Sequence, residues 1–517
     1  MICVTIARNS RRLALAGMIN AARMNADMVE VRLDTFEKQP DFAELLAAKK
    51  TPVMFSCRRV KDGGVWARSE NDRLALLRQA ILARPDYVAI EHDVAEQVRP
   101  FGNVRRVISY SNIDETPVDI ADICERCSKQ FADAVQLTCK ARNAEDAWSL
   151  LQAISRSAAP VVVVGLGWQG ITPALVGRQF GSPWVVAATE RGSEAYPGQP
   201  TVRELIDVYR FRDISRETRW IGITNLGQWE VLTIALLNAT FAAQESTKRC
   251  LPLPVGDARQ FGKIAHRLKL RGIVVGPQDQ PALRTMAEEL DDNVRFASAA
   301  SDGEQVESAV DLLMPHGEKS WKGASIFPRA AGTALRAALR RQGKSLENSM
   351  VMFAGLTPIT VGIARAVKKH GGKMIFADRD DKKANQYCRW FGGRHVRPEA
   401  VYTTLHDVTV LGATPSIDPD ADVSEPALHP GFLRPGMTLM DLTAMPRPTP
   451  LMQEAVHRGC AIVEPLDLLF ENVRRLLYRM RGQEPSRRVL KQTIASLLSD
   501  VLVSNSDFHV PLDTSES

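Results

Sequence analysis

The sequence lacks any apolar run long enough to cross a membrane. A spanning helix needs roughly 18–20 consecutive apolar residues, and no stretch of the 517 residues reaches that length. The first residues, MICVTIARNS, have the pattern of a strand and not that of a signal peptide. We therefore expect a soluble, cytoplasmic protein without a membrane partner.

Cysteine is scarce, and charge of one sign does not dominate. Eight cysteines at scattered spacings do not make a disulfide framework, and Cys124 and Cys127 form a lone Cys-x-x-Cys within a helical pattern, so buried thiols and no metal site are expected. The net charge of +6 is spread over the chain. Its densest basic stretches, 336–344 and 474–481, are typical of solvated helix faces, and no nucleic-acid partner is expected.

The residues that are present predict a multi-domain α/β protein. The chain is too long for one domain, and 45% hydrophobic with 24% charged residues is ordinary for globular proteins. Short apolar runs alternate with amphipathic stretches at 2–7, 28–33, 52–57, 87–92, 104–109, 134–138, 160–166 and 183–188. Eight strands separated mostly by helices are the count of a (β/α)8 TIM barrel, and nearly continuous apolar strands fit a parallel sheet buried on both faces.

The alternation starts again near residue 218 and predicts a two-part α/β region. Its strand-like runs lie at 220–224, 250–255, 272–275, 309–314, 350–355, 373–380, 406–415 and 437–442, and helices are expected at 466–482 and 487–502. The later part has the pattern of a Rossmann-like, mononucleotide-binding domain. The predicted domains are therefore 1–217, 218–330 and 331–505, followed by a polar tail, 506–517, expected to be disordered.

Three stretches in the first half place charged side chains at strand ends, where a barrel carries its reactive groups. Glu30, Arg32 and Asp34 end the second strand, Arg58 and Asp62 follow the third, and Gln199 lies in the loop after the eighth. Such an ion-paired cluster suits a small polyhydroxy acid, although each of these residues also fits a rim ion pair or a turn. Because these three stretches follow one another in this order on an eight-strand pattern, residues 1–215 resemble type I 3-dehydroquinate dehydratase.

The second half resembles shikimate dehydrogenase. The residues that carry this resemblance are Asn-Ala-Thr-Phe at 238–241, Leu-Pro-Leu-Pro-Val at 251–255, Gly355 opening a helix, and 441–459. The two halves together resemble the fused dehydroquinate dehydratase–shikimate dehydrogenase of aromatic amino-acid biosynthesis. The resemblance implies a lyase that forms a lysine Schiff base and uses a histidine, an oxidoreductase that binds NADP, and a small carboxylated polyol as the bound partner.

The reactive positions of the barrel family are occupied by other residues. Gln136 stands where the resemblance puts the Schiff-base lysine, and an amide cannot form an imine. Ser111 stands at the histidine, and a hydroxyl does not shuttle protons near pH 7; Ala174 stands at the arginine for the substrate carboxylate. Lys140, with the strand parity of Gln136, and His92, at a strand end, are the weak substitutes. A loop lysine and a rim histidine are the alternative interpretations.

The dehydrogenase-like half shows similar substitutions. Its catalytic lysine corresponds to Asp279, whose carboxylate would oppose a developing alkoxide, and the partner aspartate corresponds to Phe327. The expected remnants of substrate binding are Thr233, Asn238 and Asn472.

The cofactor loop is also altered. The family's Gly-Ala-Gly-Gly corresponds to Gly355-Leu356-Thr357-Pro358, which adds side chains and removes an N–H donor where a pyrophosphate would need one. Gly355 and Thr357 are the loop's remaining cofactor-binding candidates. Asp378 is placed to accept ribose hydroxyls and Arg379 to hold a 2′-phosphate, although both also fit surface charge. The resemblance therefore implies that NADP binds, whereas the residues of the cofactor loop disfavour its binding.

Three hypotheses follow. In the first, both halves are catalytically silent and the protein is a regulator, scaffold or ligand sensor, as a homo-oligomer or in complex with an active pathway enzyme. In the second, it is an active dehydratase and dehydrogenase, either because the family's reactive positions correspond to other residues of this sequence or because its residues are supplied from elsewhere. In the third, the acid and arginine cluster acts on a different hydroxy acid without a Schiff base. Substitution of four reactive positions favours the first.

Overall fold

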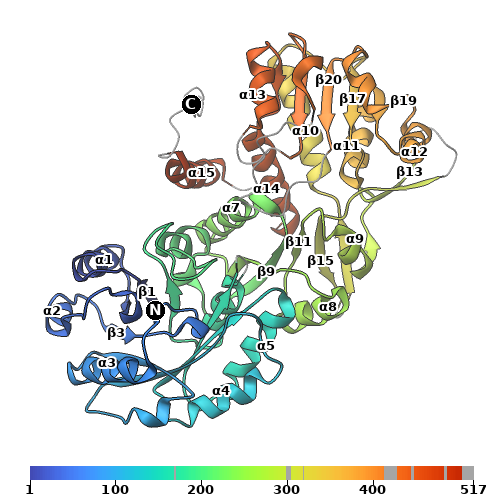
Figure 1. Cartoon of the computed structure of the whole chain (residues 1–517). Helices are drawn as coiled ribbons and strands as arrows, with labels where there is room; N and C mark the ends of the chain where they lie inside the picture. The colour runs from blue at the N-terminus through green and yellow to red at the C-terminus, as the bar shows by residue number, and fades with distance from the viewer. Residues whose placement is uncertain are drawn as a thin grey trace. The chain divides into compact units, whose positions relative to one another are not determined.

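The computed structural model describes residues 1–167, 170–298, 304–317, 320–412, 428–443, 448–481 and 486–502 (Figure 1). The chain divides into two compact units, one of residues 1–222 and 247–270 and the other of residues 223–246 and 271–517. The boundary expected at 330/331 falls inside helix α10 (Phe327–Arg341), and the division at 217 and 330 stays a prediction. The tail expected to be disordered, 506–517, lies outside the described residues.

Eight parallel strands form the core of the first unit, which confirms the predicted TIM barrel. The sheet order is β7-β6-β5-β4-β3-β2-β1-β8, and β7 also contacts β8, which nearly closes the barrel. The strands are β1 (Ile2–Ile6), β2 (Met28–Arg32), β3 (Val53–Ser56), β4 (Tyr87–Glu91), β5 (Arg105–Asn112), β6 (Ala134–Lys140), β7 (Val161–Leu166) and β8 (Val185–Ala187).

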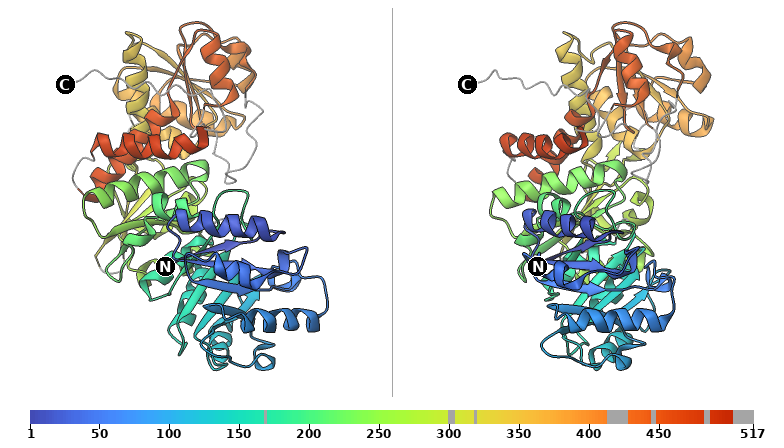
Figure 2. Two further views of the ribbon diagram at one scale, coloured as in Figure 1. Left: turned by 90° about the vertical axis from the view of Figure 1, so that its left-hand side faces the viewer. Right: turned by 60° about the vertical axis from the view of Figure 1, so that its left-hand side comes forward.

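Helices connect most consecutive strands of the barrel and lie around them (Figures 1 and 2). They are α1 (Arg11–Arg23), α2 (Phe42–Ala47), α3 (Glu70–Leu82), α4 (Ile120–Ser128), α5 (Ala144–Ile154) and α6 (Ile171–Gln179). Strand β10 (Lys248–Pro252) and helix α8 (Ala258–Arg267) also belong to this unit.

The barrel interior has an apolar layer and a polar layer. The apolar layer is one cluster of buried side chains: Cys3, Met28, Met54, Tyr87, Ala89, Val107, Ala134, Val162, Val164, Leu166, Trp184 and Val186. Because strand side chains alternate between faces, residues two positions further along also face inward. These buried residues are polar: Thr5, Glu30, Ser56, Glu91, Ser109 and Gln136. The polar layer therefore lies at the C-terminal ends of the strands, where a TIM barrel carries its site.

The second unit contains a small mixed sheet and a parallel sheet. In the mixed sheet β11 (Ile273–Val275), β15 (Leu312–His316), β16 (Ser320–Ala324) and β12 (Ala287–Leu290) are neighbours in that order, and β13 (Arg295–Ala297) pairs with β14 (Gln305–Glu307). Helices α7 (Glu230–Ala243) and α9 (Gln280–Leu283) belong to the same unit. The sequence patterns did not predict β12, β13, β14 or β16.

The parallel sheet has the strand order β19-β18-β17-β20-β21-β22. Numbered within the sheet this is 3-2-1-4-5-6, the order of a dinucleotide-binding fold, and it confirms the predicted Rossmann-like topology. The strands are β17 (Met350–Ala354), β18 (Lys373–Ala377), β19 (Arg394–Val396), β20 (Val408–Leu411), β21 (Thr438–Asp441) and β22 (Ala461–Ile462); the helices are α10, α11 (Pro358–Lys369), α12 (Asp381–Phe391), α13 (Pro450–His457), α14 (Pro465–Arg481) and α15 (Arg487–Leu502).

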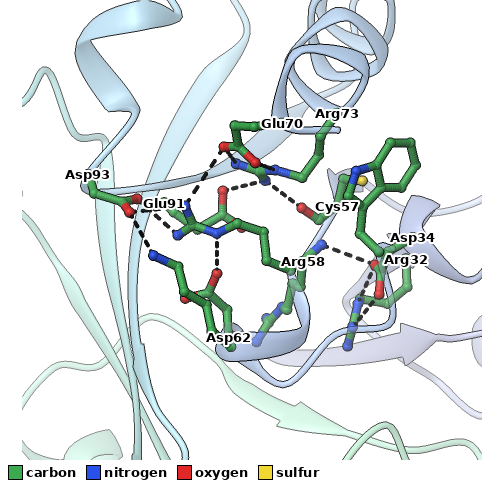
Figure 3. A network of polar contacts seen from close by, with 12 residues as sticks. Arg32, Asp34, Cys57, Arg58, Asp62, Glu70, Arg73, Glu91 and Asp93 are labelled. Carbon is green, nitrogen blue, oxygen red and sulfur yellow. Dashed lines mark hydrogen bonds and ion pairs between the residues drawn. The ribbon is translucent and has the colours of Figure 1, made fainter. Parts of the chain in front are cut away.

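Arg73 of α3 is a fully buried cation that holds the helix to the ends of two strands (Figure 3). Its Nη1 donates to Glu91 Oε2 and to the carbonyl of Cys57, each at 2.6 Å. Its Nε and Nη2 donate to Glu70 at 2.9 and 2.7 Å. Since Glu91 is also buried, loss of Arg73 would leave a carboxylate without its counter-charge.

Asp311, just before β15, caps helix α10 from outside the helix. Its Oδ1 accepts from the backbone N–H of Ile326 at 2.7 Å and its Oδ2 from that of Phe327 at 2.6 Å. Burial nevertheless raises the pKa of Asp311 to about 7, because these backbone hydrogen bonds only partly offset the loss of solvent.

We predict that Arg73→Met lowers the free energy of unfolding by about 3–5 kcal/mol, because it strands the buried Glu91 carboxylate. Arg78→Met is the matched control on α3, since Arg78 is exposed and donates only to the carbonyl of Gln97; it should change stability by less than about 0.5 kcal/mol. Denaturant titration of both variants measures the difference. Equal losses in the two variants would contradict the assignment of Arg73 as the anchor.

A second prediction concerns pH. The folded-state pKa of Asp311, about 7, lies above its ordinary value of 3.8, so the folded protein keeps a proton that the unfolded chain releases between about pH 4 and pH 7. The contribution of Asp311 to stability is present below pH 4 and is lost as the pH rises through 7, by on the order of 4 kcal/mol. Relative to the parent, Asp311→Asn should therefore gain stability across this window.

Unfolding free energies at several pH values measure this effect. Asp292→Asn, which removes an exposed carboxylate, controls for the change in net charge. A constant difference between the parent and Asp311→Asn from pH 4 to pH 8 would refute the assignment.

Candidate functional site

Glu30 is the centre of the polar layer in the barrel. Its carboxylate accepts hydrogen bonds from Thr5 Oγ1 at 3.0 Å, Ser56 Oγ at 2.7 Å and Arg58 Nη2 at 3.0 Å. Burial alone would raise its pKa, but the charges of Arg58 and Arg32 hold the pKa of Glu30 below its ordinary value. Glu30 is therefore an ionised acceptor with its own protein donors.

Arg32 and Asp34 form a second buried pair beside it. Arg32 donates through Nε and Nη2 to the two carboxylate oxygens of Asp34, at 2.9 and 2.7 Å. Asp34 also accepts from the backbone N–H groups of Arg58 and Val65 at 3.2 and 3.1 Å. Although burial opposes ionisation, the hydrogen bond from Arg32 keeps the pKa of Asp34 low. Asp34 thus ties the loop after β3 to the end of β2.

Asp62 belongs to a third group on the same rim (Figure 3). Arg59 donates to Asp62 at 2.5 Å and, in a fork, to both oxygens of Asp93 at 2.9 Å. Lys61 adds a contact of 3.2 Å to Asp93, whose pKa falls to about 2 because the Arg59 hydrogen bonds outweigh the effect of burial.

The structure brings the predicted residues Glu30, Arg32, Asp34, Arg58 and Asp62 together, and Figure 3 shows partners for most of this network. Each charge is paired with another protein charge, which is the rim ion-pair alternative that the sequence left open. The sequence did not single out further members of the network, Arg59, Glu70, Arg73, Glu91 and Asp93. Asp93 and Glu91 lie at the end of β4, so the strand-end rule applied there would have found them.

Gln199 joins the loop after β8 to this network. Its Nε2 donates to Thr5 Oγ1 at 3.2 Å and its Oε1 accepts from the N–H of Ala195 at 2.7 Å. Tyr196 in the same loop packs its ring on the apolar interior layer of the barrel. The loop is therefore held at the barrel mouth by a buried amide and an aromatic ring.

Gln136 lies in the barrel interior on β6 and is buried. Its Nε2 makes a long hydrogen bond of 3.5 Å to Thr138, and its Oε1 has no hydrogen-bond partner among the described residues. Ser111 on β5 is opposite Thr138 in the strand register, so Gln136 and Ser111 both lie on the inner face. Ala174 lies on α6, directly after β7.

The two weak substitutes lie on different faces of the strands. Lys140 ends β6 with the parity of Gln136, and within the described part of the chain its ammonium has no hydrogen bond or ion pair. The His92 ring lies 5.4 Å from that of Tyr110, a residue that alternates with the inward-facing Ser109 and Ser111. Burial lowers the pKa of His92. His92 therefore does not point into the barrel, whereas Lys140 lies on its inner face.

In the second unit, a small cavity is lined mostly by apolar side chains: Leu226, Trp229, Val274, Val275, Pro277, Gln280, Asp311, Phe327, Ile359, Leu442, Asn472 and Leu476. The Trp229 and Phe327 rings meet edge to face at 4.8 Å. Its volume is about 40 Å³, and one water needs roughly 10–15 Å³ of such space, so it has room for only a few waters.

Of the predicted residues of this half, Phe327 and Asn472 line the cavity and the others do not. Asp279 accepts from Asn225 Nδ2 at 2.7 Å, and burial raises its pKa. Thr233 and Asn238 are buried in α7, and Thr233 Oγ1 has no partner among the residues described.

The loop after β17 is closed by its own contacts. Gly355 has φ +80°, and the next N–H, of Leu356, donates to Asp378 Oδ2 at 2.8 Å. Lys383 donates to the carbonyl of Leu356 at 3.2 Å, and Tyr387 Oη to that of Thr357 at 2.7 Å. Pro358 begins α11 and has no N–H.

These residues do not fit a dinucleotide pyrophosphate, because one N–H of the loop is occupied and another is missing. Asp378 is turned back onto the loop, and Arg379 is exposed. A groove of about 460 Å³ runs beside the loop. The two cations that line the groove also have protein partners. Lys383 donates to the carbonyl of Leu356, and Arg284 donates to the carboxylate of Glu307 at 2.5 and 3.1 Å.

Metal and thiol chemistry find no support in the described residues. Within those ranges no group of three or more His, Cys, Asp or Glu side chains could hold a metal ion, and no described helix is long and apolar enough to span a membrane. Cys124 and Cys127 are free and buried, and burial raises their pKa values to about 11 and 12. This confirms the interpretation of the Cys-x-x-Cys as buried thiols.

Comparison with known proteins gives concordant results for the two halves. Residues 2–216 match the family model described as type I 3-dehydroquinase. A 3-dehydroquinate dehydratase of Methanopyrus kandleri is 30% identical over 192 residues, covering 36% of this chain and 87% of that protein. The chloroplastic bifunctional 3-dehydroquinate dehydratase/shikimate dehydrogenase of Arabidopsis thaliana is 23% identical over 491 residues, covering 90% of this chain and 79% of that protein.

Among solved structures, the dehydroquinate dehydratase and shikimate dehydrogenase of S. pombe AroM is 16% identical with a TM-score of 0.41, covering 95% of this chain and 98% of that one. From its sequence matches, the chain belongs to the type I 3-dehydroquinase family through its first 216 residues and is, over most of its length, a homologue of the bifunctional 3-dehydroquinate dehydratase/shikimate dehydrogenases.

Proposed function

We propose that this chain binds a small carboxylated polyol of the dehydroquinate or shikimate type in its barrel without converting it, as a non-catalytic homologue in aromatic amino-acid biosynthesis. The observation that carries the proposal is Gln136, an amide on the inner face of β6 with its Oε1 lacking a partner among the described residues. An amide nitrogen is not nucleophilic, so no imine forms there.

The polar layer supports binding more than turnover. Arg32 and Arg58 are each paired with a buried carboxylate, which keeps them in fixed orientations and limits their charge for a ligand. On the inner face of β6, Gln136 Oε1 and the Lys140 ammonium have free hydrogen-bonding capacity within the described ranges. A cation and an amide suit a carboxylate and a hydroxyl group. Ser111 supplies no proton shuttle near neutral pH.

The second unit supports the loss of hydride transfer. The carboxylate of Asp279 accepts a hydrogen bond from Asn225, and Phe327 and Trp229 line an apolar cavity. This cavity has room for only a few waters, far below the 300–1,000 Å³ of typical ligand pockets. The groove beside the cofactor loop is larger, about 460 Å³, but its cations Lys383 and Arg284 are engaged by protein groups. The loop at Leu356–Pro358 disfavours the pyrophosphate of NADP.

A second candidate function is dehydration through Lys140. Lys140 shares the inner face of β6 with Gln136 and has no ion-pair partner among the residues described. A free lysine in a barrel mouth is a chemically competent amine once it is deprotonated. The two candidates differ in whether the bound ketone becomes covalently attached.

We predict that 3-dehydroquinate binds the full chain reversibly and that borohydride then traps no adduct, because no amine attacks the ketone. Isothermal titration measures the binding, and intact mass with peptide mapping detects any adduct. Lys140→Met should weaken binding by about 10–100-fold, the loss expected for a hydrogen bond to a charged group. The matched control is Lys61→Met, which removes an exposed lysine already paired with Asp93.

A borohydride adduct that disappears in Lys140→Met would establish the second candidate and refute the first. If 3-dehydroquinate, quinate and shikimate all fail to bind the parent, the binding role is wrong as well. An authentic type I dehydratase treated in parallel shows that the trapping conditions work.

We also predict that the chain does not oxidise NADPH in the presence of 3-dehydroshikimate and shows no saturable NADPH fluorescence change at micromolar concentrations. The reason is that the loop offers too few free N–H donors to a pyrophosphate. The spectrophotometric assay at 340 nm and a fluorescence titration measure the two quantities. A clear rate with a Michaelis dependence on NADPH would contradict the proposal for this half.

A further inference from the structure

Four arginines converge on one pocket of the second unit. The pocket has a volume of about 230 Å³ and is lined by Asp291, Asn293, Ile326, Arg329, Arg474, Arg475, Tyr478 and Arg479. It is separate from the apolar cavity, although Ile326 lines the pocket and the next residue, Phe327, lines the cavity. Nothing in the proposed function uses these residues.

Helix geometry explains the convergence. On α14 Arg475 and Arg479 are four residues apart, as are Arg474 and Tyr478, so each pair lies along one side of the helix. Arg329 is in the first turn of α10, and α10 packs against α14. The crossing of two helices therefore brings a fifth long polar side chain to the four on α14.

The local charge is strongly positive. Glu471 binds Arg474 at 2.9 Å and Arg475 at 2.7 Å, and Asp291 binds Arg479 and also Lys322, the latter at 3.4 Å. Lys322 is also bound by Glu289. Three carboxylates thus stand against four arginines and one lysine, which leaves a formal excess of about two positive charges.

Arg329 is the cation without compensation. It is exposed, and within the described part of the chain no carboxylate or hydrogen-bond acceptor contacts its guanidinium. Burial and the neighbouring Arg329 and Arg474 charges lower the pKa of Arg475 despite its bond to Glu471. The arginines therefore repel one another across the pocket, and a bound anion would relieve the repulsion.

We propose that this pocket binds a small phosphorylated metabolite through its phosphomonoester dianion, with Arg329 as the principal contact and Arg474 and Arg479 beside it. A guanidinium presents a planar fork that matches two phosphate oxygens. A dianion balances most of the excess charge, and the pocket volume suits a phosphate with a short carbon chain. Tyr478, 55% exposed, offers a ring and a hydroxyl to the organic part.

The test uses the full chain with glycerol 3-phosphate and inorganic phosphate as probes at constant ionic strength, because surface electrostatics are screened by salt. Isothermal titration and phosphorus NMR line widths measure binding. We expect saturable binding that Arg329→Met weakens about 10-fold or more. Arg340→Met is the matched control, since Arg340 is an exposed arginine on the same helix outside the pocket; it should bind as the parent does.

Three results would overturn the proposal: no saturable binding of either probe, equal weakening by Arg329→Met and Arg340→Met, or tighter binding of malonate than of the phosphates. Tighter binding of a nucleic-acid strand that Arg329→Met abolishes would also overturn it and would make the pocket part of a macromolecular contact. Arg329→Lys keeps the charge and loses the fork, so an intermediate affinity supports the bidentate contact. Because none of these residues lies in the barrel, the outcome is independent of the 3-dehydroquinate experiment.

Discussion

The requirement that a buried charge has a partner determines the structure of the barrel. Glu30, Asp34 and Glu91 are carboxylates in a closed parallel barrel, where an isolated charge would cost several kcal/mol. Each is matched by an arginine from the same or a neighbouring element: Arg58, Arg32 and Arg73. The pairs connect β2, β3, β4 and α3, so the buried charges at the mouth of the barrel are matched by protein groups without a ligand.

The second unit satisfies the same requirement with fewer charges. One of its buried acids, Asp311, accepts from two backbone N–H groups and has no ion pair among the described residues, and burial raises its pKa to about 7. Trp229 and Phe327 line the same small cavity as Asp311. Apolar filling stabilises a closed site through burial and dispersion, so this unit gains stability where a polar substrate site would have to remain solvated.

The sequence predicted the two folds well because each depends on local patterns. Continuous apolar runs identified all eight barrel strands, and the strands β17, β18, β20 and β21 fell within predicted runs. The strands that were missed have no such pattern: β16 reads SWKGA, and β22 has only two residues. Their conformation is set by pairing with neighbouring strands, which a single sequence does not record.

Part of the candidate site was also predictable from local patterns. Residues at strand ends, such as Glu30 and Arg58, come together because parallel strands end at one rim. Arg73 was not predictable, since a charged residue near the start of an amphipathic helix is ordinarily solvated. It is buried here only because Glu91 and the carbonyl of Cys57 lie within reach. Likewise the arginines of 474–481 looked like a solvated face until α10 brought Arg329 beside them.

Gln136 in the barrel and Phe327 in the second unit, two positions singled out from the sequence, differ in how their surroundings accommodate them. In the barrel, Gln136 and Ser111 are polar, and Gln136 leaves a buried oxygen without a partner among the described residues. Such an atom costs about 1–3 kcal/mol, and an apolar side chain of the same shape would remove that cost. In the second unit Phe327 is apolar and packed. An amide kept in the barrel interior at this cost is consistent with an interior that meets water or a hydrophilic ligand, whereas the packed rings of Trp229 and Phe327 leave the small cavity of the second unit apolar.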